Sequence, residues 1–191
     1  HPELNPDDAA SVVLLPGLMC DATVWQGVIN RWTLPQPLVV AEYGFCDDLT
    51  EMARRVLRAH PGRLNIAGHS MGGRVALEMM KLAPDRIARV ALLGTGFESL
   101  PAGEAGQIER AKRQHLMDVA RHSGVRVMAS DWVKGMVPAN RLDDRTLIDP
   151  ILEMFAMRSV DHFEAQIKAL LNRPNATDTL KTWSGRVWVV A

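Results

Sequence analysis

The segment GHSMGG, residues 68–73, places a serine inside a Gly-x-Ser-x-Gly pattern. A serine attacks a carbonyl carbon only when its hydroxyl is exposed and a base takes its proton. A sharp turn from a strand into a helix supplies that exposure, and it crowds the backbone so that only small residues fit two positions before and after the serine. Gly68 and Gly72 meet this demand, and Gly73 lets the following helix pack closely. The pattern therefore predicts that Ser70 is a nucleophile.

Two backbone N–H groups are predicted to hold the negative oxygen that such an attack creates. Met71 would begin a helix, where unpaired N–H groups and the positive end of the helix dipole favour an anion. A second donor should come from the loop after an earlier strand, and LPGLMCD, residues 15–21, leaves its strand through a Pro-Gly turn. We therefore expect the N–H groups of Leu18 and Met71 to form an oxyanion hole.

None of the histidines in the chain is assigned as the base. His69 adjoins Ser70, but adjacent side chains at a strand end point in different directions, which favours a structural role. His60 precedes a strand, at the sheet end opposite Ser70. His115 and His122 fall on the apolar face of a helix that could overhang Ser70, although packing is the favoured interpretation.

Several other reactive or polar side chains are interpreted as structural. His162 follows Asp161, and the two are expected to form a solvated pair. Cys20 has no evident base, which favours a small buried thiol, and Asp47 and Asp48 are expected to cap a helix. A group of methionines beside Trp132 and Phe155 indicates either a flexible apolar pocket or, as the favoured alternative, packing; it comprises Met117, Met128, Met136, Met154 and Met157.

Composition limits the classes of function. With 191 residues, 47% of them apolar, the chain can bury one proper core. Lys plus Arg and Asp plus Glu are equal at 22, so no strong field attracts nucleic acid or an anionic membrane. Two cysteines and no zinc-like spacing predict no disulfide scaffold, metal or cofactor, and favour a reducing, cytoplasmic location. The apolar runs are too short to span a bilayer, and no signal-peptide order opens the chain.

Apolar runs alternate with helical patterns across the first half, which predicts a parallel sheet with flanking helices. Strands are expected at SVVLLPG (11–17), PLVVAEYG (37–44), RLNIAGHS (63–70), ARVALLGTG (88–96) and RVWVVA (186–191). Asp48 and Glu51 form a capping box for a helix that should stop at His60. The helix after Ser70 should end at Pro84.

Residues 98–182 read as an all-helical lid insertion between core segments 1–97 and 183–191. Its first helix is expected to bury a face of Ile108, Ala111, His115, Val119 and His122. Pro150, with Asp149 as its cap, should start or kink a second helix. The last helix carries Val160, Phe163, Ile167, Leu170 and Leu171 and should close at residues 172–175.

These segments together resemble the α/β-hydrolase superfamily over nearly the whole chain. LLPGLMCDATVW is similar to its oxyanion loop, although Pro16 stands where that family commonly has His. LNIAGHSMGGRVALEMM resembles its nucleophile elbow and following helix. The resemblance is closest to the carboxylesterase, enol-lactonase and thioesterase-like members, and it implies an α/β-hydrolase core with a helical lid. Dehalogenase and epoxide-hydrolase relatives would have Asp at the position of Ser70, which disfavours those activities.

The same resemblance implies a catalytic acid after the strand RVWVVA and a His later in the chain. The strand after the elbow continues into LLGTG without a carboxylate, so neither acid nor base is assigned, and both are expected beyond Ala191 together with the C-terminal part of the fold. Residues 186–191 would then form an exposed apolar edge strand, which predicts pairing with another chain, such as a homodimer, or with a further segment of the same protein.

The main hypothesis is a serine hydrolase that cleaves a carboxylic ester or related acyl bond, with a small apolar or acyl ester as substrate. The alternative is a truncated or degenerate noncatalytic relative that binds an apolar ligand or a partner, since triad members act as a unit. A third hypothesis is a carbon–carbon bond hydrolase or a cofactor-free haloperoxidase, which the sequence does not separate from an esterase.

Overall fold

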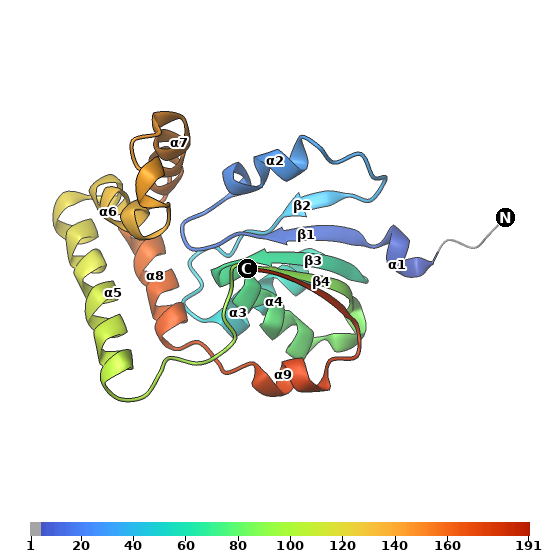
Figure 1. Ribbon diagram of the computed structural model, residues 1–191. Coiled ribbons are helices and arrows are strands. Elements are labelled where there is room, and N and C mark those ends of the chain that lie inside the picture. Colours follow the sequence, from blue (N-terminus) through green and yellow to red (C-terminus); the bar gives the residue numbers. More distant parts are fainter. Residues whose placement is uncertain (1–4) are drawn as a thin grey trace.

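A computed structural model describes residues 5–191. Five strands form one sheet in the order β2-β1-β3-β4-β5, and every neighbouring pair is parallel (Figure 1). The strands are β1 (Ser11–Leu15), β2 (Leu38–Val40), β3 (Leu64–His69), β4 (Ile87–Leu93) and β5 (Arg186–Val190). The predicted α/β class, a parallel sheet with flanking helices, is confirmed. Since all strands run the same way, their carboxyl ends meet at one edge of the sheet.

Strand β2 is shorter than predicted, because it stops at Val40 instead of continuing towards Gly44. The Ala41 N–H still donates to the Leu14 carbonyl oxygen at 2.9 Å. The chain then leaves the sheet: the Tyr43 hydroxyl donates to the Pro16 carbonyl oxygen at 2.9 Å, and Gly44 turns the backbone with φ 57°. A buried tyrosine that needs a partner for its hydroxyl therefore ends the strand.

Helices α3 (Leu49–Ala59) and α4 (Met71–Leu82) cover one face of the sheet (Figure 1). The Asp48 side chain accepts a hydrogen bond from the Glu51 N–H at 3.0 Å, so the predicted cap of α3 is present. Helix α3 ends before His60 and helix α4 before Pro84, as expected. Their buried side chains form the main part of the core with the strands, and they include Met52, Val56, Val75 and Met79.

A group of helices lies beyond the carboxyl ends of the strands (Figure 1). We call residues 104–171 the helical segment; it contains α5 (Glu104–Ser123), α6 (Val125–Trp132), α7 (Arg145–Ala156) and α8 (Val160–Leu171). Helix α9 (Thr177–Thr182) then leads back to β5. The shorter helices are α1 (Pro6–Ala9) and α2 (Gln26–Ile29), with 3₁₀ turns at Ala22–Trp25, Pro84–Arg86, Val133–Gly135 and Ala139–Arg141. That the helical segment acts as a lid stays a prediction.

The face that α5 buries differs from the predicted one. Ile108 is 49% exposed, and Ala111, His115 and His122 are exposed as well. The opposite side packs against α6 and α8. That side carries Leu116, Met117 and Ala120, which pack against the core. It also carries Glu109, which pairs with Arg113 and with buried Arg173.

Helix α7 begins at Arg145, so of the two predicted roles of Pro150 the one in which it starts the helix is wrong. The Asp144 side chain caps it by accepting from the Leu147 N–H at 3.3 Å. Pro150 consequently lies inside the helix, where its ring nitrogen has no hydrogen to donate to the preceding turn. Asp149 pairs with Arg145 across one turn at 2.8 Å instead of capping.

The methionines of the helical segment divide between packing and exposure. Met128 and Met154 are buried in the same core cluster as Phe155 and Phe163. The Trp132 ring lies edge-on to Phe163 at 6.4 Å between centroids. Met136 and Met157 are exposed. The two buried methionines therefore follow the packing alternative.

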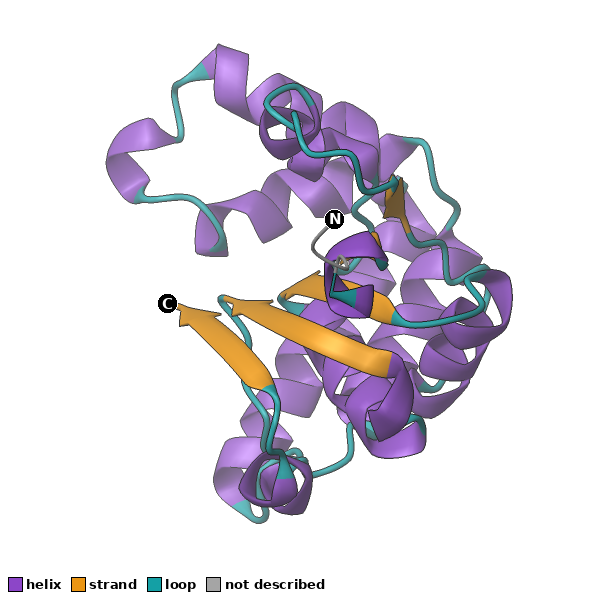
Figure 2. Ribbon diagram, turned by 90° about the vertical axis from the view of Figure 1, so that its right-hand side faces the viewer, coloured by secondary structure: helices purple, strands orange, loops and turns teal. Residues whose placement is uncertain are grey.

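Strand β5 forms one edge of the sheet, with the C-terminus of the chain at its tip (Figure 2). Among residues 5–191 it pairs with β4 alone. Trp188, Val189 and Val190 are all exposed. Association of two copies through this edge stays a prediction. No helix in the described part of the chain is long and apolar enough to cross a membrane.

Candidate active site

Ser70 occupies the junction between β3 and α4, at the carboxyl edge of the sheet. It is half-buried, and its backbone has φ 54° and ψ −118°. Its N–H donates to the Leu93 carbonyl oxygen, and its carbonyl oxygen accepts from the Gly73 N–H, both at 3.0 Å. A non-glycine residue in this left-handed region costs about 1–3 kcal/mol. The turn is held by the two flanking strands and by α4, and the side chain stays at the protein surface.

Three glycines allow the backbone to close around this turn. A Cβ on Gly68 would lie 2.3 Å from the Gly72 carbonyl oxygen, and a Cβ on Gly72 would lie 1.9 Å from the Leu15 carbonyl oxygen. A Cβ on Gly73 would lie 2.5 Å from the Thr95 side chain. Each of these contacts is shorter than any real Cβ tolerates, so the sterics require glycine at all three positions.

The loop after β1 lies directly beside Ser70. A Cβ on Gly17 would be 3.3 Å from the Ser70 Cβ. Within residues 5–191, neither the Leu18 N–H nor the Met71 N–H has a hydrogen-bond acceptor. The two unpaired donors thus belong to the two segments that meet at Ser70; that they form an oxyanion hole stays a prediction.

His69 is the histidine nearest to Ser70 in the chain, and it is half-buried. Burial lowers the pKa of its imidazole below the ordinary value. The ring lines a cavity of about 210 Å³ together with Val24, Trp25, Val28 and Leu93. In the part of the chain that the structure describes, no hydrogen bond joins it to the Ser70 hydroxyl.

The two histidines of α5 face solvent, so the prediction that they lie on a buried face is wrong. The His115 side chain is 66% exposed, and its Nε2 lies 3.6 Å from Asp131. The His122 Nδ1 lies 2.8 Å from the carbonyl oxygen of Asp118 in its own helix. His60 follows α3 at the amino edge of the sheet, opposite Ser70, as expected.

His162 is placed differently from the solvated pair with Asp161 that the sequence suggests. Its Nδ1 lies 3.1 Å from the Ser159 hydroxyl, and its ring stacks on Phe45 with centroids 3.8 Å apart. It lines a cavity of about 320 Å³ with Arg158 and Gln166. Burial lowers the pKa of the imidazole. The stacked partner from the loop after β2 could not be read from the local sequence.

The structure gives structural roles to three other side chains, those of Cys20, Asp47 and Asp48. Cys20 is buried, and its thiol donates to the Leu18 carbonyl oxygen at 3.3 Å. Burial raises the pKa of this thiol to about 12, which disfavours a thiolate nucleophile at neutral pH. Asp48 caps α3. Asp47 forms an ion pair with Lys168 on α8 instead of capping.

Sequence reasoning missed two side chains that support the site. The Thr95 hydroxyl donates to the Ser70 carbonyl oxygen at 2.7 Å. Gln166 is 3% exposed, and its Oε1 accepts from the Met19 N–H at 2.7 Å. A usable signal existed for Gln166, since it is a polar residue on the apolar stripe of its helix. No local signal pointed to Thr95, because its partner, Ser70, follows a different strand.

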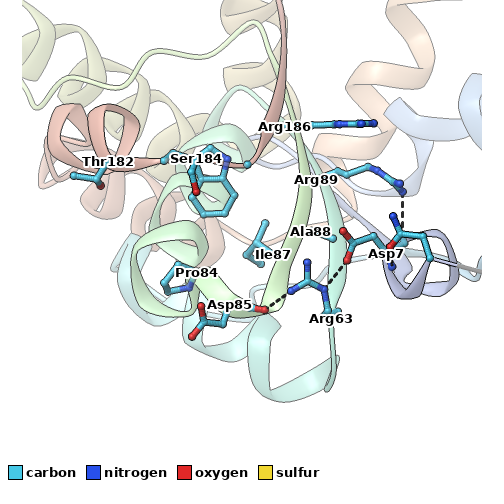
Figure 3. Close-up of a pocket in the computed structure, with 13 residues that line it drawn as sticks. Asp7, Arg63, Pro84, Asp85, Ile87, Ala88, Arg89, Thr182, Ser184 and Arg186 are labelled. Carbon is cyan, nitrogen blue, oxygen red and sulfur yellow. Dashed lines mark hydrogen bonds and ion pairs between the residues drawn. The ribbon is translucent and has the colours of Figure 1, made fainter.

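A cavity of about 450 Å³ lies at the amino edge of the sheet, and Arg63, Asp85 and Arg186 are among the residues that line it (Figure 3). Arg63 pairs with Asp7 at 2.6 Å and donates to the Asp85 carbonyl oxygen at 2.7 Å, so these groups bind one another. Among residues 5–191 no group of three or more His, Cys, Asp or Glu is placed to hold a metal ion.

Comparison with known proteins identifies the family to which this architecture belongs. The sequence model of the alpha/beta hydrolase fold family matches residues 22–124, just over half of the chain. The chain belongs to the alpha/beta hydrolase fold family. The match includes the Ser70 turn and α3, α4 and α5, and it leaves β1 and β5 outside.

This alpha/beta hydrolase fold protein also resembles one curated relative in part. It is 30% identical over 110 residues to the biotin biosynthesis bifunctional protein BioHC of Teredinibacter turnerae. The match covers 50% of this chain and 19% of that protein. The chain therefore spans only about a fifth of the length of that relative.

Solved structures of the same fold cover almost the whole chain. A thermophilic esterase from Thermogutta terrifontis has a TM-score of 0.78 at 19% identity, with 94% of this chain and 70% of that chain covered. The enol-lactonase from Burkholderia xenovorans LB400 has a TM-score of 0.76 at 17% identity, with 99% of this chain and 74% of that chain covered. MenH from S. aureus has a TM-score of 0.74 at 17% identity, with 98% of this chain and 76% of that chain covered. At these identities the similarity establishes the fold.

Proposed function

We propose that this protein is a serine hydrolase that cleaves a carboxylic ester or a related acyl bond through an acyl-enzyme on Ser70. The observation that carries the proposal is the strained turn at Ser70, with φ 54°, flanked by the loop of Gly17. Membership of the chain in the alpha/beta hydrolase fold family supports a hydrolase activity. An esterase and an enol-lactonase among the solved neighbours agree with ester chemistry.

In the proposed reaction the Ser70 Oγ attacks the carbonyl carbon of the ester while its proton passes to a base. The carbonyl oxygen becomes an oxyanion, which accepts hydrogen bonds from the Leu18 and Met71 N–H groups. Collapse of this intermediate breaks the bond to the leaving alcohol, which takes up a proton. Water then attacks the acyl-enzyme, releases the acid and restores the serine hydroxyl.

The geometry of α4 favours negative charge at this point. Met71 is the first residue of a twelve-residue helix, so its N–H lies at the positive end of the helix dipole. No acidic residue occupies the first turn of that helix. An oxyanion formed beside Ser70 therefore meets no fixed negative charge from α4.

The base is not assigned, because no His, Asp or Glu among residues 5–191 is hydrogen-bonded to the Ser70 hydroxyl. This observation favours a second candidate, a noncatalytic relative that keeps the fold and binds an apolar ligand or a partner. Removing one member of a catalytic triad abolishes most of the rate, so the two candidates differ sharply in reactivity.

Labelling of the full-length gene product with a fluorophosphonate probe tests the proposal. We expect one adduct by intact mass, located on Ser70 by peptide mapping, and none in Ser70→Ala. Cys46→Ser is the matched control, because it changes the other cysteine, which lies on the loop after β2, and should keep the adduct. A wild-type protein that reacts no faster than Ser70→Ala would contradict the serine hydrolase and leave the binding protein.

A further inference from the structure

Gln166 is a buried polar residue on the otherwise apolar inner face of α8. Its neighbours on that face are Phe163, Ile167 and Leu170, all buried. Gln166 itself is 3% exposed. Burial of an amide costs free energy unless it is hydrogen-bonded, so the side chain must have a use that offsets this cost.

The partner of Gln166 is the backbone of the loop after β1. The Met19 N–H donates to the Gln166 Oε1 at 2.7 Å, across 147 positions in the sequence. The amide orientation follows from the partner, because a backbone N–H can only donate and must face the oxygen. This bond therefore ties the helical segment to the loop beside Ser70.

The bond holds a strained part of that loop. Met19 has φ 57°, a left-handed conformation that a methionine does not adopt readily. The peptide unit between Leu18 and Met19 is fixed at both ends: its carbonyl oxygen accepts from the Cys20 thiol at 3.3 Å, and its N–H donates to Gln166. The Leu18 N–H belongs to the preceding peptide unit, whose Gly17 carbonyl oxygen accepts from the Cys20 N–H at 3.1 Å. Both peptide units that flank Leu18 are therefore held, and they set the direction of its N–H.

We propose that Gln166 is a positioning residue that keeps the Leu18 N–H in place for the oxyanion formed at Ser70. The inference rests on the proposed serine hydrolase function for its chemical meaning. The anchoring itself is a property of the fold and can be measured without activity. Gln166 thereby makes the oxyanion hole depend on how α8 sits against the core.

The test compares Gln166→Met, which has a similar size but no acceptor, with Gln166→Glu, which keeps a side-chain acceptor. Lys168→Met is the matched control, because it removes the exposed ion pair of the same helix with Asp47 but leaves the Gln166 acceptor in place. Each full-length variant is measured for ester hydrolysis, for the rate of fluorophosphonate labelling and for amide exchange at Met19. Loss of one oriented donor predicts a labelling rate and kcat lower by roughly tenfold or more in Gln166→Met, with KM little changed.

Amide exchange should report the same change without catalysis. Met19 exchange should accelerate in Gln166→Met, recover in Gln166→Glu and stay unchanged in Lys168→Met. If Gln166→Met is labelled as fast as wild type, the positioning role is overturned, while the serine hydrolase proposal stands. A wild type that is not labelled overturns the hydrolase, and Met19 exchange then decides the anchoring alone. If Gln166→Met does not fold, wild-type Met19 exchanging as fast as an unbonded loop amide still overturns the proposal.

Discussion

The Thr95 hydroxyl donates a 2.7 Å hydrogen bond to the carbonyl oxygen of Ser70. The two residues follow neighbouring strands, since Thr95 comes two positions after the end of β4 and Ser70 one position after the end of β3. The Thr95 methyl carbon also fills the space that a Cβ on Gly73 would occupy. The loop after β4 therefore stabilises the strained turn at Ser70 through this hydrogen bond and through packing against Gly73.

Thr95→Val should weaken this support while it keeps the shape of the side chain. The variant removes one hydrogen bond to a partly buried carbonyl oxygen, so we expect the free energy of unfolding to fall by about 1 kcal/mol. Urea denaturation measures the change. Thr95→Ser keeps the hydroxyl and should lie closer to wild type, and a Val variant as stable as wild type would show that the bond contributes nothing.

Ser70→Gly should stabilise the protein although it removes the nucleophile. Glycine adopts φ 54° and ψ −118° without the steric cost that a Cβ incurs, so the free energy of unfolding should rise by about 1 kcal/mol relative to Ser70→Ala. Because both variants lose the hydroxyl, the difference between them reports the backbone strain alone.

Ser130→Gly provides the control for that measurement. Ser130 is exposed inside α6, where glycine should destabilise by roughly 0.5–1 kcal/mol. Thermal or urea unfolding of the three variants separates the two signs. Equal stability of Ser70→Gly and Ser70→Ala would mean that the turn stores no backbone strain.

Gly72→Ala should disrupt the contact between α4 and the end of β1. The added Cβ would lie 1.9 Å from the Leu15 carbonyl oxygen and 2.7 Å from the Pro16 carbonyl oxygen, and both obstacles are backbone. Overpacking against atoms that cannot rotate away predicts a loss of about 3 kcal/mol or more. Solubility and urea denaturation would reveal it.

Gly135→Ala is the matched control, because a Cβ at Gly135 meets no atom within 4 Å. We expect its stability to lie within about 0.5 kcal/mol of wild type. If both alanine variants were equally stable, the close approach of α4 to β1 would be softer than the structure indicates.

Much of the fold follows from the sequence because its signals are local. The apolar runs of β1 and β3, the cap at Asp48 and the stop at Pro84 each act within a few residues, and the structure has all of them. The Ser70 turn is of the same kind, since two glycines and a strand-helix boundary define it.

The errors arise where a distant partner decides the outcome. After the end of β2, Tyr43 bonds to the Pro16 carbonyl oxygen of another loop, and on the inner side of α5, Glu109 pairs with Arg173. Gln166 supports the loop of Met19 from the far end of the chain. Spacing within one element predicts which residues share a face, but it does not contain the charge or hydrogen-bond partner that chooses between two faces.

The pair of Glu109 and Arg173 should make stability depend on pH in the acid range. Arg173 donates to both Glu109 carboxylate oxygens, at 2.8 and 3.0 Å, and it is buried. These hydrogen bonds, aided by Arg113, lower the pKa of the Glu109 carboxyl from 4.5 to about 2 against the opposing effect of burial. Because the folded pKa is the lower one, the pair stabilises the protein fully above the unfolded value and loses this contribution as pH falls from about 4.5 towards 2.

Glu109→Gln should remove this part of the pH dependence. At pH 6 we expect it to be about 2 kcal/mol less stable than wild type, since a charged partner of buried Arg173 is lost; partial exposure of the carboxylate reduces the effect by screening. The difference should shrink as pH falls towards 2, in urea denaturation at pH 6, 4 and 3. Glu104→Gln, on the exposed first turn of the same helix, should keep the wild-type slope. A difference between wild type and Glu109→Gln that stayed constant down to pH 3 would contradict the assignment, because a packing defect, unlike a titrating carboxylate, does not follow pH.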